Sequence, residues 1–196
     1  EVPKFEIKRK QFNEAEKGFW LKFGINEQTL KRFNVSSLEE FSTTSKIGNP
    51  YTTKSSFDKF IFAYENNHWV KLYKPLDEKK YKFQYLGTKA QGFIFGWKQL
   101  PVSGELLIIT GGEKDVMTLA AKGFNAITLN SETATLPKNI VDELKLRFKT
   151  ILVLYDNDET GLKQSNILAV AHGLHRLVLP TLQNNGKDIS DYFANG

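Results

Sequence analysis

The residues with the greatest capacity for chemistry lie in one short stretch, residues 151–161. It reads Ile-Leu-Val-Leu-Tyr-Asp-Asn-Asp-Glu-Thr-Gly, so five apolar residues lead into Asp156 and Asp158. The apolar run predicts a buried strand, and the helical spacing that follows to about Leu174 places both acids where the strand passes into a helix. In an open α/β sheet, ligands collect at that edge. The two carboxylates therefore stand where a ligand would bind.

Two carboxylates one residue apart on such a turn can converge on one divalent cation. Mg²⁺ prefers hard oxygen ligands and needs only one or two protein carboxylates beside substrate phosphates and water. The alternative is that Asp156 and Asp158 cap the helix, because acids are favoured at a helix N-terminus. Capping explains one acid well and two poorly, so the pair favours metal-assisted phosphoryl chemistry.

The elements that must position these acids follow from an alternation of strand-like and helix-like segments that begins at Gly104. Such alternation implies a parallel sheet with right-handed crossovers. The expected strands are 106–110, 124–129, 151–155 and 176–179, and the expected helices are 113–122, 137–148 and 160–174. The acids that this sheet would gather at one edge are Glu113, Asp115, Glu132, Asp156, Asp158, Asp188 and Asp191. They would repel each other unless cations lie among them, and bound Mg²⁺ is the simplest remedy.

The glycine pair Gly111-Gly112 follows the first of these strands. It leaves the backbone free to approach a phosphate at a helix N-terminus, although such a pair is more often only a turn. Lys114 and Lys187 lie beside acids in the sequence. Either lysine could contact a triphosphate, or it could merely balance charge.

Composition limits the class of protein. The chain has 196 residues, of which 40% are hydrophobic and 13% aromatic, as in a folded globular protein. It has no cysteine, which excludes disulfides and thiolate zinc sites, and three histidines argue against a histidine-based metal site. No apolar run approaches the length of a membrane span, so we expect a cytoplasmic protein without a membrane partner. The first residue is Glu1 rather than methionine, and we therefore expect a piece of a longer chain.

Residues 1–103 predict a smaller α+β region. Short helices are expected at 12–23 and 26–33, with Asn26 as the cap of the second. Residues 43–56 are rich in Ser, Thr, Gly and Pro and predict a loop. Residues 59–95 carry short alternating apolar runs and predict a small antiparallel sheet.

The net charge of +5 is concentrated in one part of that region. Basic residues there alternate with aromatic ones, and the two groups are Lys71, Lys74, Lys79, Lys80, Lys82, Lys89 and Lys98, and Tyr64, Trp69, Tyr73, Tyr81, Phe83 and Tyr85. This pattern suits a nucleic-acid backbone with bases stacked beside it. It suits equally a solvated strand face whose aromatic rings turn into the core.

Three motifs together resemble a Toprim domain, the metal-binding fold of bacterial-type primases, type IA and II topoisomerases and some nucleases. They are Leu-Leu-Ile-Ile-Thr-Gly-Gly-Glu-Lys-Asp-Val around Asp115, the Asp-Asn-Asp stretch, and Gly-Lys-Asp-Ile-Ser-Asp-Tyr around Asp188. Their spacing resembles the primase branch in particular. Residues 23–35 are similar to the helical motif that opens the primase catalytic core, and residues 71–100 resemble its basic subdomain.

The resemblance implies an α/β fold with a C-terminal Toprim domain, residues 104–196, built on a four-stranded parallel sheet flanked by helices. The basic α+β subdomain, residues 1–103, would precede it. The residues that the resemblance makes metal ligands are Asp115, Asp156, Asp158 and Asp188. One position departs from the family, because Gly111 stands where most Toprim domains have a glutamate. Either Glu113 takes over as the acid that assists nucleotidyl transfer, or the domain is weakened or inactive.

The leading hypothesis is therefore a primase catalytic core of a phage, mobile-element or bacterial helicase–primase. It would make RNA primers on a single-stranded DNA template from ribonucleoside triphosphates, with Mg²⁺ or Mn²⁺ as cofactor and a replicative helicase as partner. Glu113, Asp115, Asp156 and Asp158 would be catalytic. Phosphates would be held by Lys71, Lys74, Lys82, Lys98, Lys114 and Lys187.

Three other functions remain open. A Toprim-like module could bind DNA without catalysing a reaction, and a Toprim nuclease or topoisomerase would share the same motifs. The Asp-x-Asp-x-Thr pattern also matches haloacid-dehalogenase-type phosphatases, in which Asp156 would be the nucleophile. That fold places the motif early in the chain, whereas only a short stretch follows it here.

Overall fold

The computed structural model describes residues 4–45, 47–129, 131, 133–181 and 186–195. Packing divides the chain into two compact units. The first consists of the described parts of Glu1–Trp20 and Leu30–Gln91, and the second of those of Leu21–Thr29 and Gly92–Gly196.

The second unit thus begins upstream of the predicted start at Gly104 and also takes in a short N-terminal segment. Phe95 forms a backbone bridge with Thr128, with N–O distances of 3.0 Å in both directions. Ile94 and Trp97 pack against the hydrophobic core of the second unit. Through these contacts Ile94, Phe95 and Trp97 belong to the second unit, although the sequence pattern assigns them to the first region.

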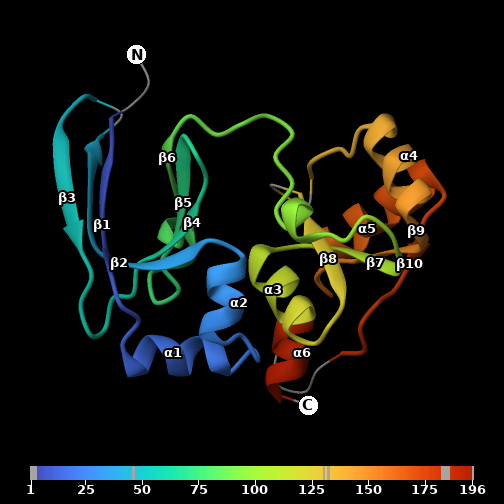
Figure 1. Ribbon diagram of the computed structural model, residues 1–196, viewed down its shortest axis with the longest axis horizontal. Helices are drawn as coiled ribbons and strands as arrows, with labels where there is room; N and C mark the ends of the chain where they lie inside the picture. The colour runs from blue at the N-terminus through green and yellow to red at the C-terminus, as the bar shows by residue number, and fades with distance from the viewer. Residues whose placement is uncertain (1–3, 46, 130, 132, 182–185, 196) are drawn as a thin grey trace. The chain divides into compact units, whose positions relative to one another are not determined.

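The first unit is built on a six-stranded antiparallel sheet (Figure 1). Its strands are β1 (Glu6–Lys10), β2 (Val35–Thr44), β3 (Pro50–Lys54), β4 (Phe62–Glu65), β5 (Trp69–Tyr73) and β6 (Phe83–Gly87). They lie in the order β1-β2-β4-β5-β6, with β3 pairing β2. The sheet predicted over 59–95 is confirmed as β4 to β6. The loop predicted over 43–56 is wrong in part, because β3 pairs with β2 and the hydroxyls of Ser42 and Thr52 bond across the strands at 2.8 Å.

Two short helices lie between β1 and β2 in the chain. They are α1 (Glu14–Leu21) and α2 (Glu27–Arg32). Asn13 and Glu16 form a reciprocal cap at the start of α1, in which each side chain accepts the other's backbone N–H at 2.8 and 3.0 Å. The predicted cap of the next helix is confirmed, since Asn26 accepts the N–H of Thr29 at 2.9 Å.

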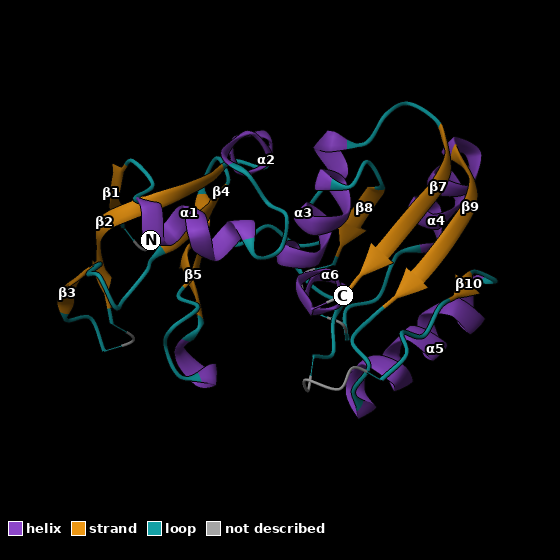
Figure 2. Ribbon diagram, turned by 90° about the horizontal axis from the view of Figure 1, so that it is seen from below, coloured by secondary structure: helices purple, strands orange, loops and turns teal. Residues whose placement is uncertain are grey.

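The second unit is a four-stranded parallel sheet covered by helices. The strands are β7 (Gly104–Thr110), β8 (Asn125–Thr128), β9 (Phe148–Leu154) and β10 (His175–Arg176), and the helices are α3 (Glu113–Ala121), α4 (Lys138–Arg147), α5 (Glu159–His172) and α6 (Ile189–Asn195). Short 3₁₀ turns lie at Lys79–Tyr81 in the first unit and Trp97–Gln99 in the second. The strand order is β10-β9-β7-β8, and every pairing is parallel. Figure 2 shows α3 and α6 on one side of this sheet and α4 and α5 on the other. The predicted α/β class, a parallel four-stranded sheet with a further α+β region, is confirmed.

The core of this unit explains why its central strands are so apolar. Leu107 and Ile109 of β7, Ile127 of β8 and Val153 of β9 are each 0% exposed. Helices on both faces leave no solvated side, and strands of that kind read as continuous apolar runs. No helix in the described part of the chain combines the length and the apolar character that crossing a bilayer requires.

Candidate functional site

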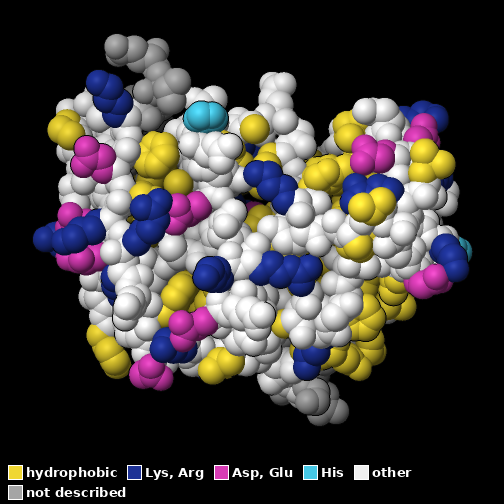
Figure 3. Space-filling model, viewed as in Figure 1, with side chains coloured by type: hydrophobic (Ala, Val, Ile, Leu, Met, Phe, Trp, Pro, Cys, Tyr) yellow, Lys and Arg dark blue, Asp and Glu magenta, His cyan; other side chains and the backbone are white. Residues whose placement is uncertain are grey.

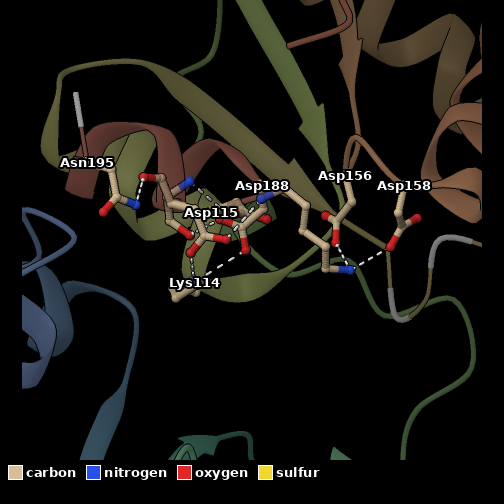
Figure 4. A network of polar contacts seen from close by, with 9 residues as sticks. Lys114, Asp115, Asp156, Asp158, Asp188 and Asn195 are labelled. Carbon is tan, nitrogen blue, oxygen red and sulfur yellow. Dashed lines mark hydrogen bonds and ion pairs between the residues drawn. The ribbon is translucent and has the colours of Figure 1, made fainter. Parts of the chain in front are cut away.

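The carboxyl ends of three parallel strands lie level with one another. Thr110, the last residue of β7, pairs with Leu154 of β9 on one side and with Thr128 of β8 on the other. The segments that follow β7 and β9 therefore leave the sheet side by side. The first leads to Asp115 in α3, the second carries the Asp156–Asp158 pair, and the loop before α6 brings Asp188 to the same edge (Figure 4).

Asp115 is the most deeply buried acid at this edge, with 3% of its surface exposed. It lies in the first turn of α3, where the helix dipole favours a negative charge. Its Oδ1 accepts the backbone N–H of Ser190 at 3.3 Å, which ties α3 to the start of α6. Burial, followed by the charges of Asp188 and Asp156, raises the pKa of Asp115 well above its ordinary value, while Lys114 opposes the shift.

Asp156 and Asp158 share one lysine. The ammonium of Lys187 lies 2.7 Å from Oδ2 of Asp156 and 2.6 Å from Oδ2 of Asp158. The other oxygen of Asp158, Oδ1, accepts the N–H of Gly161 at 2.9 Å and so caps α5. Capping thus accounts for one oxygen of Asp158. It does not account for the carboxylate of Asp156, which forms an ion pair with Lys187.

The backbone holds Lys187 in this position. The carbonyl of Lys187 accepts the N–H of Asn157 at 2.7 Å, and the N–H of Lys187 donates to Asp191 Oδ2 at 3.2 Å. Burial lowers the pKa of Lys187, but its bonds to Asp156 and Asp158 outweigh that effect and raise the pKa above its ordinary value. For Asp156 burial has the opposite effect and raises the pKa, and the bond from Lys187 partly offsets this rise.

A second lysine bridges the acids near α6. The ammonium of Lys114 lies 3.3 Å from Asp188 and 3.4 Å from Asp191, and 4.1 Å from the ring centroid of Phe23. Asp188 also caps α6, since its Oδ1 accepts the N–H of Asp191 at 2.7 Å and the hydroxyl of Ser190 at 2.6 Å. Two cationic side chains thus lie among the acids.

Gly161 fixes the approach of α5 to the Asp156 loop. A Cβ atom at this position would lie 2.2 Å from the carbonyl oxygen of Asp156 and 2.9 Å from its backbone nitrogen. Only glycine allows the helix to begin so close to that backbone. The last residue of the sequence motif is therefore needed to position the first acid.

The acids could hold a divalent cation in exchange for a lysine. Among the residues that the structure describes, no three histidine, aspartate or glutamate side chains are placed to hold a metal ion together. The Asp156–Asp158 pair nonetheless already surrounds one cation, the Lys187 ammonium. Mg²⁺ requires only one or two protein carboxylates beside phosphates and water. The oxygen donors of this pair therefore fit Mg²⁺ or Mn²⁺.

The other residues predicted for the site are more dispersed. Glu113 is 8% exposed at the first position of α3, and Glu132 lies outside the described residues. Lys71 and Lys74 are buried in the first unit, and Lys74 pairs with Asp77 at 3.5 Å. Lys82 of the first unit is partly exposed, and Lys98 of the second unit is exposed. Of the predicted lysines, Lys114 and Lys187 contact the acids at the edge of the parallel sheet.

Sequence reasoning overlooked two residues that organise the site, Asn157 and Ser190. Asn157 forms two hydrogen bonds with the C-terminal segment. Its backbone N–H donates to the carbonyl of Lys187, and its side chain donates to the carbonyl of Leu179 at 3.0 Å. The Asp-x-Ser-Asp run at 188–191 is a helix-capping pattern and could have revealed Ser190. Asn157 carries no comparable signal, since its partners are far along the chain.

Several solved structures with a similar fold are primase catalytic cores. The primase fragment of the bacteriophage T7 primase-helicase protein matches with a TM-score of 0.61 at 18% identity, covering 94% of this chain and 73% of that one. The E. coli primase catalytic core matches with a TM-score of 0.61 at 15% identity, covering 91% and 68%. A DnaG primase catalytic domain bound to ssDNA matches with a TM-score of 0.61 at 14% identity, covering 92% and 73%.

The chain therefore has the fold of the bacterial and phage primase catalytic core, and the expected resemblance is confirmed at the level of fold. No protein-family model matches the sequence, and no curated protein matches it either.

Proposed function

We propose that this chain is the catalytic core of a DNA primase with a Toprim domain. It would join ribonucleotides into a primer on single-stranded DNA during replication in a bacterial or phage-infected cell. Support comes from acids of three separate segments, Asp115, Asp156 and Asp188, which act on each other electrostatically at one sheet edge. The shared fold with primase cores supports the same assignment.

The acids would hold Mg²⁺ or Mn²⁺, with Asp156 and Asp158 as first ligands and Asp115 and Asp188 completing the set. The bound metal would supply charge neutralisation at the triphosphate and an activated 3′-hydroxyl. Lys187 would then leave the carboxylates and turn its ammonium toward the phosphates. Its side chain is 46% exposed, so it has solvent into which to move.

Basic residues outside the acidic edge would bind the polyanions. Lys114 would hold a phosphate beside Asp188, while Lys71, Lys74, Lys82 and Lys98 would contact template or triphosphate. The printed descriptions of two structural relatives, one bound to ssDNA and one part of a primase-helicase protein, support single-stranded DNA and a replicative helicase as partners.

Primer synthesis on single-stranded DNA with labelled ribonucleotides tests the metal residues. We expect Asp156→Asn and Asp115→Asn to reduce the rate at least about 100-fold, as for the loss of a metal ligand in phosphoryl transfer. Asp142→Asn on α4 is the control, because Asp142 also pairs with a lysine but lies away from the site. Undiminished synthesis by both site variants would end the assignment.

Gly111 raises the alternative that the module binds DNA without catalysing a reaction. We expect Glu113→Gln to reduce synthesis about 100-fold, because Glu113 would be the acid that assists transfer. If Glu113→Gln has no effect and Gly111→Glu raises the rate, the missing glutamate limits the enzyme instead. Binding of DNA without synthesis in both proteins, even after a template-reading domain is supplied, would support the non-catalytic alternative.

A further inference from the structure

One face of the sheet in the first unit is covered with aromatic rings. Because β4, β5 and β6 pair in register, their alternate residues share this face. The aromatic members are Phe62, Tyr64, Trp69, Tyr73, Phe83 and Tyr85. The rings of β4 and β5 are buried, whereas Phe83 and Tyr85 of the edge strand β6 are 48% and 37% exposed. The buried rings of β4 and β5 therefore match the alternative in which aromatic rings turn into the core. The exposed rings of β6 match the alternative in which they are open to nucleic-acid bases.

The two exposed rings are backed by buried ones. Phe83 stacks on Tyr73 with a centroid distance of 5.1 Å and an interplanar angle of 14°. Tyr85 lies 5.8 Å from the ring of Trp69. As alternate residues of one strand, Phe83 and Tyr85 are about 7 Å apart. The buried rings hold both exposed rings in fixed positions, which reduces the side-chain entropy that the protein loses when a ligand binds.

Cations lie next to the same rings. The ammonium of Lys71 is 4.5 Å from the ring centroid of Phe83 and 5.9 Å from that of Tyr85, and Lys89 is 4.6 Å from Tyr85. Between residues 71 and 89 the chain has six lysines and two acids. Figure 3 shows hydrophobic side chains that reach the surface next to Lys and Arg side chains over this unit. A positively charged rim suits a polyanion better than an apolar protein partner.

We propose that Phe83 and Tyr85 form a stacking platform for two unpaired bases of single-stranded DNA, whose phosphates Lys89 attracts. Duplex DNA does not fit this site, because its base faces are already stacked. The identity of the strand as a primase template rests on the proposed function. The platform itself rests on the exposed rings, their backing and the adjacent cations.

Fluorescence anisotropy with an oligothymidylate of about 12 nucleotides tests the platform. The comparison strand has the same number of phosphates but no bases. We expect Phe83→Ala to weaken oligothymidylate binding roughly tenfold and to leave the abasic strand within about twofold. Phe83→Trp keeps a stacking surface and should bind as the wild type does. Phe57→Ala is the control, since Phe57 is an 86% exposed phenylalanine of the same unit outside this face.

The salt dependence separates stacking from charge. Phe83→Ala should leave the slope of log K against log salt unchanged, whereas Lys89→Ala should reduce its magnitude by about 0.7. Equal affinity of the wild type for oligothymidylate and the abasic strand would overturn the platform, and so would wild-type DNA affinity in both Phe83→Ala and Tyr85→Ala. Loss of abasic binding in Phe83→Ala would also overturn it, because the ring would then act only through the fold.

The binding assay contains neither nucleotide nor metal, so it is independent of catalysis. If the protein binds DNA through the platform but makes no primer, the primase assignment is refuted and the platform is not. If the protein makes primers but its Phe83 and Tyr85 variants bind DNA normally, the platform is refuted and the primase assignment is not.

Discussion

Lys187 occupies the position between Asp156 and Asp158 where we propose that a divalent cation binds. Its ammonium donates to both carboxylates, at 2.7 and 2.6 Å. A metal ion and this ammonium cannot both lie between the same two oxygens. Replacing Lys187 by methionine, which keeps the aliphatic stem and removes the charge, should therefore strengthen metal binding in the absence of nucleotide.

The magnitude follows from the contacts that the metal must displace. The side chains of Lys187 and Asp158 are 46% and 40% exposed, so solvent screens their interaction, while Asp156 is 17% exposed. Screened ion pairs of this kind contribute about 1 kcal/mol each, or about 2 kcal/mol for the two. We expect Lys187→Met to bind Mn²⁺ roughly ten- to thirtyfold more tightly.

Mn²⁺ binding can be followed by electron paramagnetic resonance of the free ion at about pH 8. Lys138→Met is the matched control, because Lys138 pairs with Asp142 on α4 at 2.6 Å and its loss changes the net charge equally. It should leave Mn²⁺ affinity within about twofold. Mn²⁺ affinity in Lys187→Met that is equal to or weaker than that of the wild type would refute the exchange of lysine for metal.

Two further predictions concern the stability of the fold and are measured by urea unfolding. Gly161→Ala should lower the free energy of unfolding by about 1–3 kcal/mol, because its Cβ would meet the backbone of Asp156 at 2.2 Å, whereas Gly18→Ala in α1 meets nothing within 4 Å and should not destabilise. Arg9→Met should cost about 1 kcal/mol at pH 7, since Arg9 binds both oxygens of Glu65 at 2.9 and 2.6 Å. Burial raises the pKa of Glu65, but the bonds from Arg9 and from the hydroxyl of Ser36 together outweigh it, and the net shift is downward. This stabilisation is therefore present above the ordinary pKa and lost as the pH falls through the lowered one, so the difference from wild type should shrink as the pH falls below the ordinary pKa of about 4.3; a difference that stays constant in acid would contradict the pairing.

Local periodicity was sufficient for most of the second unit. The apolar runs that became β7 and β9 and the helical spacing of α3 and α5 are properties of neighbouring residues, and burial on both faces makes them visible in the sequence. The same reasoning failed for β1 and β2. These strands are rich in charged and hydroxyl residues, and the apolar side chains that β2 places in the core, Leu38 and Phe41, are three residues apart and do not alternate as a strand pattern requires.

The sequence by itself determined the candidate chemistry, because the acids and their spacing along the chain are written in it. Only the tertiary structure decided which side chains meet. The order β10-β9-β7-β8 brings Asp115, Asp156 and Asp188 to one edge. The hydrogen bond from the Asn157 N–H to the Lys187 carbonyl helps to place Lys187 between Asp156 and Asp158. It also decided that Phe83 remains exposed while Tyr73 is buried, since that depends on which strand ends the sheet. Pairing between distant segments is set by register and packing, and no window of neighbouring residues contains that information.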